Sequence, residues 1–492
     1  MTSERFDVIV AGSGSAGGTL AARLSEDADC RVLLLEAGRD FPDEELSPPG
    51  FFAGGAHTGE RNAGAGPWAP EYDWNYESEP LSNGRRLALR RGKLVGGSSM
   101  TNGCVAVRGR PEDFARWEQA GATGWSWDEV LPFYEIVERE LNVFSYPPEL
   151  WLPVQRLVLD GFQETGFRYV EDMNAPDSWD GVVGPWPRSR RNEMRLGSLN
   201  TYIRAARGRP NFFIRDRAMV DRVLFNGTRA TGLEFVNGDG HRETVHGDRV
   251  VVAGGAYGSA PILLRSGVGP AQELRDLAIK PLVDLPVGRN LMEHPGLTVS
   301  IEVDPAFARM GWPTLAAVVR GDGWWGIPAP HLADQNLIAI KFLLATHEGP
   351  EGGVIRLSSS DVNDPPLIDH GFRSVIDARL FDGPWTAFQE LLKTERFRSA
   401  HARDPLGDTR LEDRLLDGLI SGAHPAGSCA IGEVVSPDLD VYGTDGLYVA
   451  DASVFPRHVT NNLNTTCFVV GEIAARKLRG QGVPMPRTVA SA

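Results

Sequence analysis

The sequence predicts a mixed α/β protein that begins with a parallel strand–helix–strand unit. Phe6 to Val10 is a short apolar run typical of a buried strand, Gly18 to Leu24 favours a helix, and Arg31 to Leu35 is a second apolar run. A glycine-rich turn separates the first strand from the helix. This order is typical of a dinucleotide-binding unit, in which phosphates lie against the amino end of the helix.

The glycine-rich turn has the spacing that such a unit needs. Gly12 permits a tight turn, Gly14 lets the main chain approach a pyrophosphate, and Gly17 lets the helix pack on the strand. Glu36 ends the second strand at about the 20-residue spacing of an acid that binds ribose hydroxyls. A glycine-rich turn in an unrelated α/β unit is the alternative, and the motif alone leaves FAD and NAD undecided.

Composition narrows the class of protein and its surroundings. The 492 residues carry a formal net charge of −15, which argues against a nucleic-acid partner. Four cysteines without a C-x-x-C pair predict neither a metal site nor a disulfide framework, and favour a reducing compartment. We find no signal-peptide pattern and no apolar run of about 20 residues, so we predict a cytoplasmic protein without a transmembrane segment. Peripheral contact with a membrane stays open.

Two segments further along the chain resemble a known enzyme family. They read RRGKLVGGSSMTNGCVAVRGR at residues 90–110 and GGAYGSAPILLRSGVG at residues 254–269. Both resemble the signature segments of the glucose-methanol-choline (GMC) oxidoreductases, although Ala260 stands where the family usually has Ser or Pro. Four other family landmarks occur in family order: DWNY at 73–76, VGRNL at 287–291, HPAGS at 424–428 and GLYVADAS at 446–453. The resemblance implies FAD as the cofactor.

The first signature has the chemistry that FAD binding requires. Gly96 and Gly97 would let the main chain lie against the cofactor, and Ser98 and Asn102 offer neutral hydrogen-bond donors. Thr101 stands where some family members have a histidine bonded covalently to the flavin, so we predict non-covalent FAD. The residues that the resemblance assigns to FAD contacts are Gly12, Gly14, Ser15, Ala16, Gly17, Glu36, Ala37, Gly96, Gly97, Ser98, Asn102, Gly103, Val105, Val220, Asp451, Ala452, Asn464 and Thr465.

The resemblance implies a catalytic pair near the C-terminus, His424 and Asn464. An alcohol carbon gives up hydride readily only as its oxygen becomes alkoxide-like, so a base must take the hydroxyl proton. Histidine suits this role because its ordinary pKa is about 6.5, and an amide can hydrogen-bond the developing oxyanion. We interpret His294 as structural and His458 as a loop residue without a catalytic role.

The resemblance also implies the domain organisation. A Rossmann-like FAD-binding domain is expected in three pieces, 1–140, 196–300 and 422–492. A substrate-binding domain is expected at 141–195 and 301–421, built on an antiparallel sheet backed by helices, so that the chain is α+β overall. Strands are predicted at 338–344 and 353–358, and a helix at 377–394.

Three further segments have simpler interpretations. Trp312, Trp324 and Trp325 either line a substrate entrance or cover a core, and the sequence leaves both open. The Gly- and Ala-rich stretch 57–68 is predicted to be a mobile loop near the active site, and 480–492 a disordered tail.

The sequence therefore predicts an FAD-dependent enzyme that oxidises a small-molecule alcohol to an aldehyde or ketone. His424 would abstract the proton, flavin N5 would accept the hydride, and oxygen or a quinone would take the electrons. The alternatives are a mycofactocinol dehydrogenase linked to the respiratory chain, within a mycofactocin-associated branch of the family, and an FAD-containing hydroxynitrile lyase. An NAD enzyme and a binding module without turnover are more distant alternatives.

Overall fold

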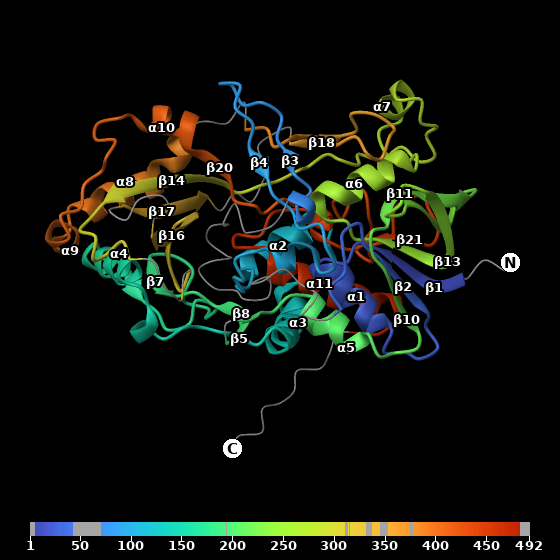
Figure 1. Cartoon of the computed structure of the whole chain (residues 1–492), viewed down its shortest axis with the longest axis horizontal. Coiled ribbons are helices and arrows are strands. Elements are labelled where there is room, and N and C mark those ends of the chain that lie inside the picture. Colours follow the sequence, from blue (N-terminus) through green and yellow to red (C-terminus); the bar gives the residue numbers. More distant parts are fainter. Residues whose placement is uncertain are drawn as a thin grey trace, which may run out of the picture.

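The computed structural model describes residues 5–42, 70–192, 194–309, 313, 315–330, 337–344, 353–372 and 378–482. Within these ranges the chain forms two seven-stranded sheets, which lie at opposite ends of the molecule (Figure 1). The structure thus confirms the predicted mixed α/β class.

The first sheet is parallel over most of its width. β10 (Phe212–Arg215), β2 (Val32–Leu35), β1 (Arg5–Ala11), β13 (Arg242–Val252) and β21 (Leu447–Val449) run in one direction. The other half of β13 pairs antiparallel with β12 (Arg229–Val236), which pairs with β11 (Met219–Asn226). The strands predicted at 6–10 and 31–35 are confirmed as β1 and β2, and both are buried because helices cover them.

Helices pack closely against this sheet and each other. The predicted helix at 18–24 is confirmed as α1 (Ser15–Leu24), although it begins three residues earlier, directly after Gly14. α1 lies against α11 (Asn464–Leu478), which also contacts α3 (Trp127–Glu140). A Cβ on Gly471 would lie 2.5 Å from the carbonyl oxygen of Ala16, so the two helices approach at a distance that only glycine allows.

The second sheet is mostly antiparallel, in the order β20-β14-β17-β16-β15-β7-β6. Helices α4 (Pro153–Glu164), α8 (Asp382–Leu392) and α9 (Glu395–Ser399) gather at the same end of the molecule, and α4 and α8 contact its strands (Figure 1). Its strands are β6 (Arg168–Tyr169), β7 (Val182–Pro185), β14 (Pro295–Glu302), β15 (Ala317–Gly321), β16 (Trp324–Pro330), β17 (Leu337–Leu344) and β20 (Leu419–Ser421). The prediction of an antiparallel sheet backed by helices is confirmed.

Individual elements of this region differ from the prediction in length. The strand expected at 338–344 is β17, whereas the one expected at 353–358 is only β18 (Val354–Arg356), paired with β19 (Leu367–Asp369). In the helix predicted at 377–394, η6 (Ala378–Phe381) precedes α8, which begins at Asp382. The predicted domain division stays a prediction, and its boundary at residue 300 cuts through β14.

The remaining elements connect the sheets or lie at their edges. The helices are α2 (Pro111–Gln119), α5 (Arg204–Ala206), α6 (Gly255–Arg265), α7 (Ala271–Asp276) and α10 (Leu411–Gly418). The short helical turns are η2 (Pro70–Tyr72), η3 (Gly97–Met100), η4 (Pro148–Leu150), η5 (Leu199–Ile203) and η7 (Ala452–Val454). The short strands are β3 (Tyr76–Glu77), β4 (Ala88–Leu89), β5 (Val143–Phe144), β8 (Arg188–Arg191) and β9 (Met194–Arg195).

The structure decides between the two interpretations for two of the three tryptophans. Trp324 and Trp325 are buried at 5% and 2% exposure, so these two rings cover the core. Trp312, the stretch 57–68 and residues 483–492 lie outside the described residues. In the described part of the chain, no helix combines the length and the apolar character needed to cross a membrane.

The core behind the second sheet depends on Phe397 of α9. This side chain is fully buried, and a Cβ on Gly161 of α4 would lie 2.9 Å from its ring. We expect Phe397→Ala to lower the free energy of unfolding by about 3–5 kcal/mol, because it leaves a cavity between α4 and α9. Chemical denaturation measures the loss. The control Leu406→Ala removes an exposed side chain and should change the value by less than about 0.5 kcal/mol. Equal effects of the two changes would contradict this packing.

Candidate active site

A cavity of ≈ 620 Å³ is lined by residues from both sheets. From the first sheet come the loop between β1 and α1 and the end of β2; from the second come β16 and β17. The segments around His424 and Asn464 complete the wall. The cavity therefore joins the glycine-rich loop to the predicted catalytic residues.

Glycines bring main chain close together at one side of this cavity. Gly12 has a φ of +107°, and a Cβ there would lie 2.3 Å from the carbonyl oxygen of Ala253. A Cβ on Gly17 would lie 2.1 Å from the carbonyl oxygen of Gly12. Gly14, by contrast, precedes the first residue of α1 and has open space where its Cβ would be. These are the tight turn, the close packing and the open approach that a pyrophosphate site requires.

Ser13 joins the two glycine-rich loops, a role that the sequence reasoning missed. Its hydroxyl donates to Glu36 Oε2 at 2.6 Å and accepts from the backbone N–H of Gly96 at 3.0 Å. The backbone N–H groups of Ser13 and Gly38 also donate to the Glu36 carboxylate. Burial raises the pKa of Glu36, and these donors oppose the rise. Glu36 therefore holds the loops together; its contact with ribose stays a prediction.

The C-terminal segment is tied to the cavity by two polar side chains. Asp451 accepts hydrogen bonds from Ser259 Oγ at 2.5 Å and from the backbone N–H groups of Gly255 and Ser453. Asn464 Oδ1 accepts a hydrogen bond from Ser15 Oγ at 2.7 Å. Asn464 thus lies at the amino end of α1, on the side of the cavity where phosphate is expected.

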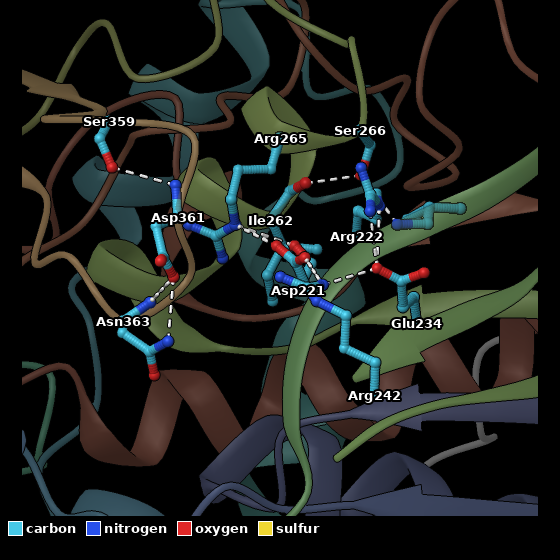
Figure 2. Close-up of polar contacts among 11 residues, drawn as sticks. Asp221, Arg222, Glu234, Arg242, Ile262, Arg265, Ser266, Ser359, Asp361 and Asn363 are labelled. Carbon is cyan, nitrogen blue, oxygen red and sulfur yellow. Dashed lines mark hydrogen bonds and ion pairs between the residues drawn. The ribbon is translucent and has the colours of Figure 1, made fainter. Parts of the chain in front are cut away.

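A network of charges positions the part of β11 that contains Val220 (Figure 2). Next to Val220, the buried Asp221 carboxylate accepts a hydrogen bond from Arg265 Nε of α6 at 2.8 Å and pairs with Arg242. Ser266 donates to the carbonyl oxygen of Ile262 and accepts from the backbone of β11. Because β11 is held to α6 in this way, Val220 reaches the cavity wall.

Most of the predicted cofactor residues line the cavity. They are Gly12, Gly14, Ser15, Ala16, Glu36, Ala37, Gly97, Ser98, Asn102, Gly103, Val105, Val220, Asp451, Ala452 and Asn464. Gly17, Gly96 and Thr465 are not among the lining residues. Gly17 and Gly96 instead shape the loops. The individual contacts of all these residues with FAD remain predictions.

His424 is buried beside the cavity and held from several sides. Its backbone N–H donates to Glu293 Oε1 at 2.8 Å, and its carbonyl oxygen accepts from His458 Nε2 at 2.7 Å. Its Nδ1 lies 3.1 Å from Nδ1 of His294. His294 therefore contacts the predicted base directly, and the fully buried His458 fixes its main chain, which is more than the sequence assigned to either residue.

The structure corrects the predicted partner of His424. Asn462 Nδ2 lies 2.8 Å from His424 Nε2, whereas Asn464 is bonded to Ser15. The pairing of His424 with Asn464 is therefore wrong in this geometry. Asn464 is the first residue of α11, so it is held near α1, while Asn462 precedes the helix and faces the imidazole. The sequence N-N-L-N contains both candidate partners of His424, Asn462 and Asn464. Only the residue at which α11 begins distinguishes them.

Burial and neighbouring cations lower the pKa of His424 well below 6.5. Burial has the largest effect, followed by the charges of His458, Lys341 and Arg91. His424 is therefore neutral and able to accept a proton. Because Asn462 Nδ2 can only donate, the lone pair of His424 Nε2 faces this amide and the ring proton lies on Nδ1, toward His294.

Comparisons with known proteins identify the family. The model of the GMC oxidoreductase N-terminal region matches residues 6–296, and that of the C-terminal region matches residues 350–471. The chain belongs to the GMC oxidoreductase family. It is therefore an FAD-dependent oxidoreductase that acts on CH–OH groups, as the sequence predicted.

Relatives and solved structures match nearly the whole chain. An oxygen-dependent choline dehydrogenase of Pseudomonas aeruginosa (strain UCBPP-PA14) is 31% identical, over 99% of this chain and 97% of the relative. One from Burkholderia thailandensis is 32% identical, over 97% and 94%. The structure of pyridoxine 4-oxidase from "Mesorbium loti" has a TM-score of 0.85 at 25% identity, over 97% and 99%. A fungal aryl-alcohol oxidase, with a TM-score of 0.81 at 21% identity over 96% and 98%, shares the fold.

The residues of the cavity fit FAD. The open space at Gly14, the main chain of Gly97 beside it and the amino end of α1 provide a surface for a pyrophosphate. Thr101 lines the cavity and has no ring nitrogen for a covalent link to flavin, which agrees with non-covalent binding.

A substitution at Gly97 tests whether the two glycine-rich loops form the FAD site. It has a φ of +51°, and a Cβ there would lie 2.9 Å from Cα of Gly14. We expect Gly97→Ala to weaken FAD binding by at least about tenfold, because the added methyl group separates the two loops. Flavin absorbance during titration of the apoprotein measures the affinity. Gly84 has a φ of +82° and open space around it, so Gly84→Ala introduces similar backbone strain without the collision. Loss of FAD affinity in both variants would contradict the proposed FAD site at Gly14 and Gly97.

Proposed function

We propose that this enzyme oxidises an alcohol to an aldehyde or ketone, with His424 as the base that removes the hydroxyl proton. The observation that carries the proposal is the contact of the neutral His424 Nε2 with the Asn462 amide in the wall of the cavity. Bound FAD would supply the hydride acceptor for the alcohol carbon, at flavin N5, and oxygen or a quinone-type acceptor would take the electrons.

Two side chains, His424 and Asn462, act on the substrate hydroxyl group in different ways. His424 Nε2 takes the hydroxyl proton, and the Asn462 amide donates a hydrogen bond to the oxygen as negative charge develops on it. His294 Nδ1 accepts a hydrogen bond from His424 Nδ1–H, which leaves the lone pair on Nε2, where the substrate hydroxyl would replace the Asn462 contact, and stabilises the imidazolium. The contact of Glu293 with the backbone of His424 fixes the ring's position before the substrate arrives.

Substitutions separate the two asparagines. We expect His424→Ala to slow flavin reduction by about 10²–10⁴ and Asn462→Ala by about 10²–10³. Asn464→Ala should instead reduce FAD content, since Asn464 is bonded to Ser15 rather than to His424. Anaerobic stopped-flow absorbance with an alcohol substrate gives the rate, and the flavin spectrum gives the content. A larger loss of rate in Asn464→Ala than in Asn462→Ala would reject the assignment of Asn462.

The pH dependence follows from the lowered pKa of His424. A base whose pKa lies well below 6.5 is still unprotonated at pH 6.5, so acidification through this value does not remove it. We expect the limiting rate of flavin reduction to stay constant as the pH is lowered from 8 through about 6.5. A decline with a midpoint at or above that value would show that the base is not the buried, neutral imidazole.

A screen of alcohols under anaerobic conditions distinguishes the broader alternatives. Alcohol oxidation bleaches the flavin, whereas a hydroxynitrile lyase releases cyanide from a cyanohydrin without bleaching. Rapid reoxidation by oxygen would identify an oxidase, and reoxidation by a quinone alone a dehydrogenase. Bleaching only by a mycofactocinol would favour the mycofactocin-linked enzyme.

A further inference from the structure

Lys341 is a charged residue in an otherwise apolar part of the cavity wall. The described residues of β16 and β17 that line the cavity are Ile327, Ala329, Ala339, Lys341 and Leu343. Ala339, Lys341 and Leu343 alternate along β17, so they share one face, and Ile327 is the cross-strand partner of Lys341. The ammonium group therefore extends from an apolar surface toward the space that contains His424.

Among the described residues, none forms a hydrogen bond or ion pair with Lys341. Burial lowers the pKa of Lys341, and the Glu293 carboxylate opposes this effect. Glu293 already accepts hydrogen bonds from Ser421 Oγ and from the backbone N–H groups of His294 and His424. An unpaired ammonium in a partly buried position is unfavourable, and an anion supplied by a ligand would pair with it.

The charged groups that the described residues place near His424 are two cations, Lys341 and Arg91, and one carboxylate, Glu293, so the cations are in excess. Lys341 and Arg91 both act on His424 as cations, and both line the cavity. Arg91 Nε and Nη2 are buried and make no hydrogen bond to the described residues. The carboxylates of Glu36 and Asp451, by contrast, lie in the loops assigned to the cofactor and are occupied there. A cationic substrate would therefore be repelled from the space beside His424.

We propose that Lys341 selects alcohols that carry a carboxylate group, and that it excludes the quaternary ammonium cation choline. A single ammonium beside apolar side chains suits a carboxylate attached to an apolar body. The substrate class is therefore a hydroxy acid. The inference rests on the proposed alcohol oxidation for the hydroxyl end of the substrate, while Lys341 recognises the opposite end.

Ligand binding tests this role without requiring turnover. Benzoate and butyrate serve as anionic probes, and benzamide and butyramide are their neutral counterparts of matched size. Changes in the flavin spectrum of the FAD-loaded enzyme give the dissociation constants. We expect each carboxylate to bind about 10–100 times more tightly than its amide, since a charge-assisted contact accounts for the difference.

Variants at position 341 separate charge from shape. Lys341→Met should abolish the preference for the carboxylates while leaving amide binding unchanged, and Lys341→Arg should retain the preference. Lys341→Glu should allow choline to bind, because the repelling charge is reversed. Lys393→Met removes an exposed lysine of the segment after α8 and should change none of these values.

Several results would overturn the proposal. They are equal binding of acid and amide to the unaltered enzyme, no measurable binding of either carboxylate, and equal weakening of acid and amide by Lys341→Met. A Lys341→Met variant that changes only the reoxidation rate by oxygen would assign the charge to the flavin instead. Failure of the alcohol oxidation itself is recognised separately, because flavin bleaching would then be absent while carboxylate binding would still depend on Lys341.

Discussion

The arrangement of the active site depends on one buried carboxylate, that of Glu293. Two histidine-bearing segments that are distant in sequence, one before β14 and one after β20, meet at this group because the backbone N–H groups of His294 and His424 both donate to it. Ser421 Oγ donates to its second oxygen at 2.7 Å. Burial raises the pKa of Glu293, and these donors and Arg91 oppose the rise. A carboxylate without such donors would be costly at this depth, so the contacts that stabilise its charged form also fix the base.

The hydrogen bonds to Glu293 lie where the two sheets contribute to the same cavity. The first sheet supplies the glycine loops for the cofactor, and the second supplies the face of β16 and β17 that borders His424. Ser13 joins the glycine loops in the same way that Glu293 joins the histidine segments: one buried polar side chain accepts or donates across two loops. In both places main-chain groups are satisfied internally, which leaves the cavity-facing groups free for ligands.

The sequence predicted the parts of the site that depend on local geometry. Gly12 and Gly17 form the tight turn and the close helix packing expected from their spacing, and Gly14 has the open space that its predicted pyrophosphate contact needs. The sequence paired His424 with the amide of Asn464 instead of that of Asn462, because the residue where α11 begins cannot be predicted from the letters N-N-L-N. The isolated lysine in the apolar run of β17 was a signal that could have been used. Its meaning required the register of β16 against β17, which depends on contacts distant in sequence.

Lys341 also connects substrate selection to the chemistry at His424. Burial lowers the pKa of His424 most, followed by His458, and repulsion from the cations Lys341 and Arg91 lowers it further. A substrate carboxylate paired with Lys341 would cancel part of this repulsion. The base would then accept its proton more readily from an anionic alcohol than from a neutral one of the same shape, and the preference would extend from binding to the rate of flavin reduction.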